Sequence, residues 1–393
     1  MHVFQEAHTT NAQKTQCFLT KKPKQTMICL HSRNLCQMHK HELFTFATCI
    51  QKGTGMETVF TLATSPAIEQ AAALLRQGEL VAFPTETVYG LGADALNEKA
   101  VAHIFAAKGR PGDNPLIVHV AEKSQLDDLC EVTPDAEKLM DAFWPGPLTI
   151  LLKKKPAVPD VTTAGLPSVA VRCPDHPVAL ALLRESRVPV AAPSANRSGR
   201  PSPTTASHVY EDMNGRIAMI LQGGDCRVGV ESTVLDMTKD VPCILRPGAV
   251  TKEMVISVLG RCTVADSVMR PLKEGEAAPS PGMKHRHYAP RASMTVYTGN
   301  REKVIAEICR RYDEAENAVI LALDGDIPSF GERHTLSIGT SPEETAHLLF
   351  KRLRETDEMG VSLVLAQGWE GEEMVLAVMN RMARAAAFDV IKL

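Results

Sequence analysis

Several features of large protein classes are missing from this sequence. No run approaches the roughly 18–20 consecutive apolar residues that a membrane-spanning helix needs, so we expect no membrane contact. The opening residues MHVFQEAHTT lack the basic and apolar segments of a secretory signal. The later cysteines form no CxxC pair and lie far apart among apolar neighbours. These absences predict a cytoplasmic protein with reduced thiols rather than a disulfide framework.

Excess positive charge and the common catalytic motifs are also absent. The formal net charge is −3, which argues against a chain held to nucleic acid by a broad cationic surface. The sequence has no GxxxxGK[ST] phosphate loop, no GxGxxG after a strand, no HExxH and no GxSxG. Any nucleotide chemistry must therefore use a different scaffold.

Residues 1–55 differ from the rest of the chain. They are rich in Gln, Thr, His, Lys and Cys and show no sustained helical or strand period. We therefore predict a disordered extension, with folding from about Met56. A zinc site is the alternative interpretation, with five candidate ligands: Cys29, His31, Cys36, His39 and His41. Structural zinc sites usually have closely paired ligands, and that spacing is absent here.

From Ser65 onward, helical and strand patterns alternate. The segment SPAIEQAAALLRQG begins with Ser-Pro, ends with glycine and has an apolar stripe at helical spacing. Short apolar runs such as ELVAFPT, PLIVHVA and SVAVRCP have the character of strands and end at turn residues. This alternation predicts an α/β domain, which we place at residues 56–262.

A second domain follows a proline-rich connection. Residues 263–291 have little apolar content and no period, which is typical of an interdomain linker. Residues 292–393 then alternate strand and helix, from ASMTVYTG to LAVMNRMARAAA. The pattern predicts a small parallel sheet with helices on both faces.

Polar residues gather where the chain leaves two of the predicted strands. The segment PTETVYGLGAD, residues 84–94, supplies hydroxyls that can bind a small polar ligand or simply cap the turn. The segment APSANRSGRPSPTT, residues 192–205, follows an apolar strand, at the end where α/β sheets generally bind ligands.

Cations lie in two further segments. In KGRPGDNP, Lys108 and Arg110 are two residues apart, where they can clamp phosphate oxygens or complement a helix dipole. Farther on, Ser232 begins a strand and Arg246 ends one, and a buried arginine usually has an anionic partner. The four segments together supply cations, hydroxyls and an amide but no obvious nucleophile. That set suits charge neutralisation around a polyphosphate.

The order and spacing of these motifs resemble the YrdC-type threonylcarbamoyl-AMP synthases. The resemblance rests on PTETVYGLGAD, KGRPGDNPLIVHV, WPGPLT, VAVRCPDHP, APSAN, VESTVLD and LRPGA. The linker SPGMKHRHYAP and the α/β tail resemble the long, two-domain form, and the likeness runs from about Met56 to Leu393. It implies a YrdC-like twisted open α/β domain followed by a smaller, Rossmann-like α/β/α domain.

The resemblance also implies a reaction. Threonine, bicarbonate and ATP, with Mg²⁺ bound to the nucleotide, would give threonylcarbamoyl-AMP and pyrophosphate. A separate tRNA threonylcarbamoyl transferase complex would then use the product, so the synthase itself would need no tRNA contact. No metal ligand from the chain is implied.

The same motifs imply the site residues. Lys108 and Arg110 would act in catalysis by offsetting charge on the phosphates. The threonine ligands would be Thr87, His119, Arg172, Ser194 and Ser232. The ATP ligands would be Arg110, Asn114, Ser168, Asn196, Thr204, Arg246 and Tyr288. The linker would fold over the cleft as a lid and add Arg286 or His287, while His285 stands where many relatives have tyrosine.

Two other functions stay open at this point. One is an RNA-binding YrdC-like module, which the negative net charge and the lack of interleaved basic and aromatic residues disfavour. The other is a carbamoyltransferase-like maturation factor. Such a protein adds acylphosphatase and zinc-finger segments, for which residues 1–55 are too short and wrongly patterned.

Overall fold

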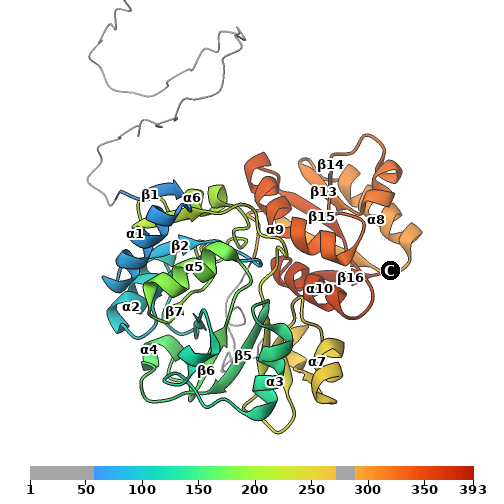
Figure 1. Cartoon of the computed structure of the whole chain (residues 1–393). Helices are drawn as coiled ribbons and strands as arrows, with labels where there is room; N and C mark the ends of the chain where they lie inside the picture. Colours follow the sequence, from blue (N-terminus) through green and yellow to red (C-terminus); the bar gives the residue numbers. More distant parts are fainter. Residues whose placement is uncertain (1–56, 271–287) are drawn as a thin grey trace, which may run out of the picture. The chain divides into compact units, whose positions relative to one another are not determined.

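The computed structural model describes residues 57–270 and 288–393. The predicted extension with its candidate zinc ligands lies outside the described residues, as do His285, Arg286 and His287. The described chain forms two β-sheets, one of eleven strands and one of five (Figure 1). No helix within these two ranges is long and apolar enough to cross a membrane.

The first sheet is open and mixed, with the spatial order β1-β8-β2-β3-β7-β4-β6-β5-β9-β10-β11. Its strands are β1 (Val59–Leu62), β2 (Val81–Phe83), β3 (Gly90–Asp94), β4 (Ile117–His119), β5 (Leu148–Lys153), β6 (Ser168–Arg172), β7 (Val190–Ala191), β8 (Met219–Gln222), β9 (Thr233–Asp236), β10 (Cys243–Arg246) and β11 (Thr263–Val264). In the centre, β4 runs parallel to β6, with His119 in register with Arg172. Two predicted ligands therefore lie side by side at the strand ends.

Seven helices accompany this sheet in the described part of residues 57–270. They are α1 (Ser65–Arg76), α2 (Glu98–Lys108), α3 (Pro134–Phe143), α4 (Asp160–Thr163), α5 (Pro177–Ser186), α6 (Ala206–Met213) and α7 (Lys252–Leu259). Helices α1 and α5 pack in one apolar cluster with β2, while α2 and α3 belong to another. Because both faces of the sheet are covered, central strands such as β2 are apolar throughout rather than alternating.

The second sheet has the order β14-β13-β15-β12-β16, and all of its paired strands are parallel. The strands are β12 (Ser293–Thr298), β13 (Ala318–Ala322), β14 (Thr335–Ser337), β15 (Leu363–Gln367) and β16 (Val390–Lys392). Helix α8 (Arg301–Asp313) packs on one face, and α9 (Pro342–Met359) and α10 (Met374–Ala385) pack on the other. The predicted parallel sheet with helices on both faces is confirmed.

Two strands differ from the sequence-based expectation. The predicted turn at residues 84–94 contains β3, which pairs antiparallel with β2. Its glycines hide it from pattern analysis, yet a Cβ at Gly92 would lie 2.9 Å from side-chain atoms of Phe83 and Val190, so close strand packing requires glycine there. The first sheet also extends into the predicted linker, because β11 pairs with β10.

Candidate active site

One pocket lies where the strands of the first sheet end. It contains about 600 Å³ of space not occupied by protein atoms, including its open mouth. His119 at the end of β4, Arg172 at the end of β6 and Arg246 at the end of β10 all line it. This is the position at which open α/β sheets generally bind ligands.

The structure brings most of the predicted site residues together. Nine of them line the pocket: Thr87, Arg110, His119, Arg172, Ser194, Asn196, Ser232, Arg246 and Tyr288. Four others do not line it: Lys108, Asn114, Ser168 and Thr204. The pocket also has a lining residue that the sequence did not single out, Glu231, which directly precedes Ser232.

Arg110 reaches the pocket because helix α2 ends just before it. Gly109 takes a left-handed conformation (φ +67°) after the last turn, and the chain turns there. The Arg110 guanidinium lies 5.5 Å from the centre of the Phe105 ring. Burial lowers the pKa of Arg110 to about 10, against a smaller raising effect of Asp113. Its Nε and Nη2 atoms have no hydrogen-bond partner among the described residues, as expected of a group that awaits an anionic ligand.

Asn114, four residues after Arg110 in the same loop, is fully buried. Neither its side-chain oxygen nor its nitrogen finds a hydrogen-bond partner in residues 57–270 or 288–393. Such a buried amide is costly to leave unsatisfied, so we expect it to hydrogen-bond to a ligand or a water.

Lys108 has a different environment from its neighbour. Its ammonium donates to the carbonyl oxygens of Ser194 and Asn196, the latter at 2.7 Å, and its nitrogen lies 3.4 Å from Asn196 Oδ1. Burial lowers the pKa of Lys108 well below its usual value, and the charge of Arg110 adds to this. The structure thus gives Lys108 loop carbonyls as partners, and its contact with phosphates stays a prediction. It fixes the segment that carries Ser194 and Asn196.

Arg172 is held by a buried carboxylate that the sequence did not assign. Its Nη2 lies 2.7 Å from Glu86 Oε1, an ion pair without the alignment of a hydrogen bond, and both side chains are buried. Arg172 Nε donates to Gly146 O at 3.3 Å. The only sequence signal for Glu86 was its place among the hydroxyls of PTETVYG.

His119 is neutral in the pocket. Burial and the adjacent Arg172 charge lower the pKa of His119 to about 3, and Ile117 O lies 3.1 Å from its Nδ1. The ring can therefore exchange hydrogen bonds with a ligand, but it supplies no positive charge at neutral pH.

Ser232 and Arg246 form one unit. Arg246 donates to the Ser232 carbonyl at 3.0 Å and to its hydroxyl at 3.1 Å, and that hydroxyl also contacts Thr149 Oγ1 at 2.8 Å. Burial lowers the pKa of Arg246 to about 10, while the nearby Glu231 opposes this shift. Burial would raise the pKa of Glu231, but Arg381, Arg246 and the Ser202 hydroxyl outweigh it and keep the carboxylate charged.

Hydroxyls on two loops complete the lining. Thr87 Oγ1 lies 2.8 Å from Thr85 Oγ1 in the turn after β2. Ser194 donates to Asn196 Oδ1 at 2.5 Å, and the Asn196 amide donates to the carbonyls of Arg197 and Arg200. These internal bonds restrict the conformation of a loop rich in Ser, Asn and Gly.

The remaining predicted ligands are Ser168, Thr204 and Tyr288, and of these only Tyr288 lines the pocket. Ser168 begins β6, about 13 Å along the strand from Arg172, so it lies at the far end from the pocket lining. Thr204 is buried and bonds through its backbone to His208 and Cys226. Tyr288 does line the pocket, and its ring packs 5.0 Å from that of Phe350 in α9. Burial, with Glu231 nearby, raises the pKa of Tyr288.

No protein-built metal centre is found in the described ranges: no group of three His, Cys, Asp or Glu side chains there could hold a metal ion. The six described cysteines are all free, as the sequence predicts. The fold and this pocket therefore define an α/β protein with two separate β-sheets and an arginine-lined pocket.

Comparison with known families identifies the group more closely. Residues 73–248 match the family model described as telomere recombination, named Sua5_yciO_yrdC. Residues 250–387 match the model described as threonylcarbamoyl-AMP synthase, C-terminal domain. The chain belongs to the threonylcarbamoyl-AMP synthase family, in its two-domain form.

Similar curated proteins cover most of the chain. The threonylcarbamoyl-AMP synthase of Pyrococcus abyssi is 48% identical over 83% of this chain and 95% of its own length. That of Bacillus subtilis is also 48% identical, with the same shares covered. That of Schizosaccharomyces pombe is 41% identical over 82% of this chain and 89% of its own length.

Solved structures agree with the fold. Sua5 of P. abyssi in complex with L-threonine is 45% identical, covers 86% of this chain and all of its own, and superposes with a TM-score of 0.77. A double variant of the same protein is 44% identical, covers 86% of this chain and 98% of its own, and gives a TM-score of 0.79. The YrdC-like domain followed by a Rossmann-like domain is thereby confirmed.

Proposed function

We propose that this protein is an L-threonylcarbamoyladenylate synthase, which makes threonylcarbamoyl-AMP and pyrophosphate from L-threonine, bicarbonate and ATP. The observation that carries the proposal is that Arg110, Arg172 and Arg246 line one pocket. Three guanidinium groups beside hydroxyls suit a ligand with several negative oxygens. Family membership and the threonine complex of the P. abyssi relative support the choice of substrates.

The reaction takes two steps. The threonine amine attacks the bicarbonate carbon, a nitrogen–carbon bond forms, and water is lost to leave a carbamate. A carbamate oxygen then attacks the α-phosphorus of ATP, and the bond to the bridging oxygen breaks to release pyrophosphate. Negative charge shifts onto the leaving oxygens, so fixed cations accelerate this step.

The pocket residues take distinct roles in this proposal. Arg172, oriented by Glu86, binds the threonine carboxylate, and neutral His119 beside it hydrogen-bonds to the amino acid. Thr87, Ser194 and Ser232 provide further polar contacts to threonine. These groups would select an amino acid whose carboxylate and side chain both form hydrogen bonds.

We assign the nucleotide contacts to other residues of the site. Arg110 and Arg246 bind the phosphates, and Lys108 fixes the loop whose Asn196 lies at the pocket. Tyr288 and the unsatisfied amide of Asn114 are further ATP contacts, and Ser168 and Thr204 reach the ligand only through a rearrangement or a water.

Magnesium belongs to the substrate in this proposal. With no acidic or imidazole cluster in the described chain to hold it, Mg²⁺ arrives on the ATP phosphates and neutralises part of their charge. The product leaves for a separate tRNA threonylcarbamoyl transferase complex in the cytoplasm. No observation favours an RNA-binding module or a maturation factor over this function.

The test is product formation by the full chain. The protein is incubated with ATP, Mg²⁺, bicarbonate and threonine, pyrophosphate is followed with time, and threonylcarbamoyl-AMP is identified by mass spectrometry. We expect pyrophosphate release that requires both threonine and bicarbonate. Release at the same rate without threonine would overturn the proposal.

A further inference from the structure

Two arginines of the second domain are buried against loops of the active site. Arg381 of α10 is fully buried, although arginine is rarely buried without a strong set of partners. Its Nε donates to Glu231 Oε2 at 2.9 Å, and its Nη1 donates to Pro247 O at 2.8 Å. One side chain thus joins the residue before Ser232 to the residue after Arg246.

The same carboxylate extends the connection to a third loop. Glu231 Oε1 accepts a hydrogen bond from the Ser202 hydroxyl at 2.6 Å, and both side chains are buried. Ser202 lies in the segment that carries Ser194 and Asn196. Arg381 therefore contacts two site loops directly and a third through Glu231.

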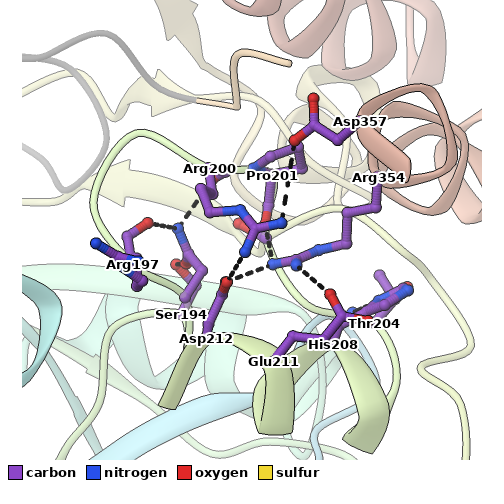
Figure 2. A network of polar contacts seen from close by, with 12 residues as sticks. Ser194, Arg197, Arg200, Pro201, Thr204, His208, Glu211, Asp212, Arg354 and Asp357 are labelled. Atoms are coloured by element: carbon purple, nitrogen blue, oxygen red, sulfur yellow. Dashed lines mark hydrogen bonds and ion pairs between the residues drawn. The ribbon is translucent and has the colours of Figure 1, made fainter. Parts of the chain in front are cut away.

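Arg354 of α9 holds that third loop from another direction. Figure 2 shows its guanidinium among Pro201, Asp212 and Glu211. It donates to Pro201 O at 2.6 Å and to Asp212 Oδ2 at 2.8 Å, and the Arg354 side chain is 1% exposed. Pro201 and Ser202 are adjacent, so both arginines act on the same short stretch.

The network continues from Asp212 to the pocket. Arg200 also pairs with Asp212 (Figure 2). The Arg200 carbonyl accepts a hydrogen bond from the Asn196 side chain at 2.9 Å. Asn196 in turn accepts from Ser194. Hydrogen bonds and ion pairs thus run without a break from α9 to a residue that lines the site.

We propose that Arg354 and Arg381 are positioning residues for the synthase reaction, so that the second domain sets the geometry of the substrate pocket. The inference rests on the proposed function, and it assigns the second domain a role in substrate binding. A role limited to joining the domains would not require contacts with the loops that carry Ser194, Ser232 and Arg246. Both arginines contact these loops. A buried guanidinium with several fixed partners restricts those loops more than an apolar contact of equal area does.

The experiment uses two variants, called the anchor variants, and each is chosen so that no buried carboxylate loses its cation. The double variant Arg354→Met with Asp212→Asn removes the contacts of Arg354 and changes no pocket-lining residue. The variant Arg381→Lys keeps a cation near Glu231 but loses the guanidinium fork. The matched control is Arg301→Met with Asp326→Asn, which deletes an arginine–aspartate pair within the second domain, where Asp326 is also buried.

Two measurements on the full chain separate positioning from stability. Steady-state pyrophosphate release gives KM for threonine and for ATP apart from kcat. Hydrogen–deuterium exchange reports the backbone protection of residues 194–204 and 231–233. We expect KM for at least one substrate to rise at least fivefold in both anchor variants, with faster exchange in these segments. The control should stay within twofold of the parent in KM, with unchanged exchange there.

The opposite results overturn the inference. They are unchanged KM and unchanged exchange at residues 194–204 in the anchor variants, or effects that the control pair reproduces. If the parent released no threonine-dependent pyrophosphate, the proposed function would fail. The exchange comparison would still decide whether α9 and α10 fix these loops.

Discussion

Replacement of Arg110 by alanine should separate activity from stability. In the protein without ligand, Arg110 Nε and Nη2 are buried and have no hydrogen-bond partner in the described ranges. Leaving such donors unsatisfied costs about 1–3 kcal/mol, which the substitution relieves. Against this stand the lost contact with the Phe105 ring, about 0.5–1 kcal/mol, and the attraction of Asp113, about 0–1 kcal/mol. These contributions largely offset one another, so the free energy of unfolding should change by between about −1 and +2.5 kcal/mol.

The effect on catalysis should be much larger. Two hydrogen bonds from a guanidinium to phosphate are each worth about 1.5–3 kcal/mol. Their loss in the transition state amounts to about 3–6 kcal/mol, a fall in kcat/KM for ATP of roughly 10²–10⁴-fold.

The assay compares pyrophosphate release at varied ATP with unfolding by denaturant. Arg76→Ala is the control, because Arg76 is an exposed arginine in the last turn of α1 whose side chain bonds to Glu185 O. It should keep parental kcat/KM. If Arg110→Ala kept its activity, or lost activity only in proportion to lost stability, Arg110 would have no role in binding phosphate.

Three further substitutions test other parts of the site. Lys108→Met should lower the free energy of unfolding by about 2–6 kcal/mol and should also lower activity, because two loop carbonyls lose their donor. A stable, inactive variant would contradict the loop-holding role. Glu86→Gln should raise KM for threonine more than KM for ATP, because Arg172 loses its buried partner. Equal changes in both constants would argue against a role of Glu86 in orienting Arg172 for threonine. The pKa of His119 is about 3 when folded and about 6.5 when unfolded, so its stability contribution is present above pH 6.5 and is lost as the pH falls. The difference in unfolding free energy between the parent and His119→Asn should fall by about 2 kcal/mol between pH 7 and pH 5. Denaturant titrations that give the same difference at both pH values would refute this prediction.

The sequence predicted most elements because their patterns are local. The Ser-Pro start and glycine stop of α1 and the apolar run of β2 are readable within a few residues, and both elements form. β3 was missed because its glycines reflect contacts with Phe83 and Val190, which no local pattern reveals. Similarly, the two residues of β11 are too few for a period to be visible.

The site was predictable in its membership but not in its internal pairing. The motif order led to nine residues that line one pocket, since strand ends of one sheet converge. It did not reveal that Lys108 binds carbonyls while Arg110 has open donors, because both are cations two residues apart at the end of α2. Their difference arises from tertiary contacts, because the partners of Lys108 are carbonyls 86 and 88 residues farther along the chain.

Charge balance explains why the pairing matters for function. Of the arginines that line the pocket, Arg172 has Glu86 as a partner, and Arg246 shares Glu231 with Arg381 of the second domain. Two carboxylates thus offset three guanidinium groups, and Arg110 adds a fourth, whose positive charge Asp113 favours. Burying this excess of positive charge is unfavourable until an anion enters. Anion binding therefore recovers part of the free energy that burial of these charges costs on folding. A site built this way should bind a polyphosphate strongly and a neutral nucleoside weakly, because only the phosphates compensate the charge.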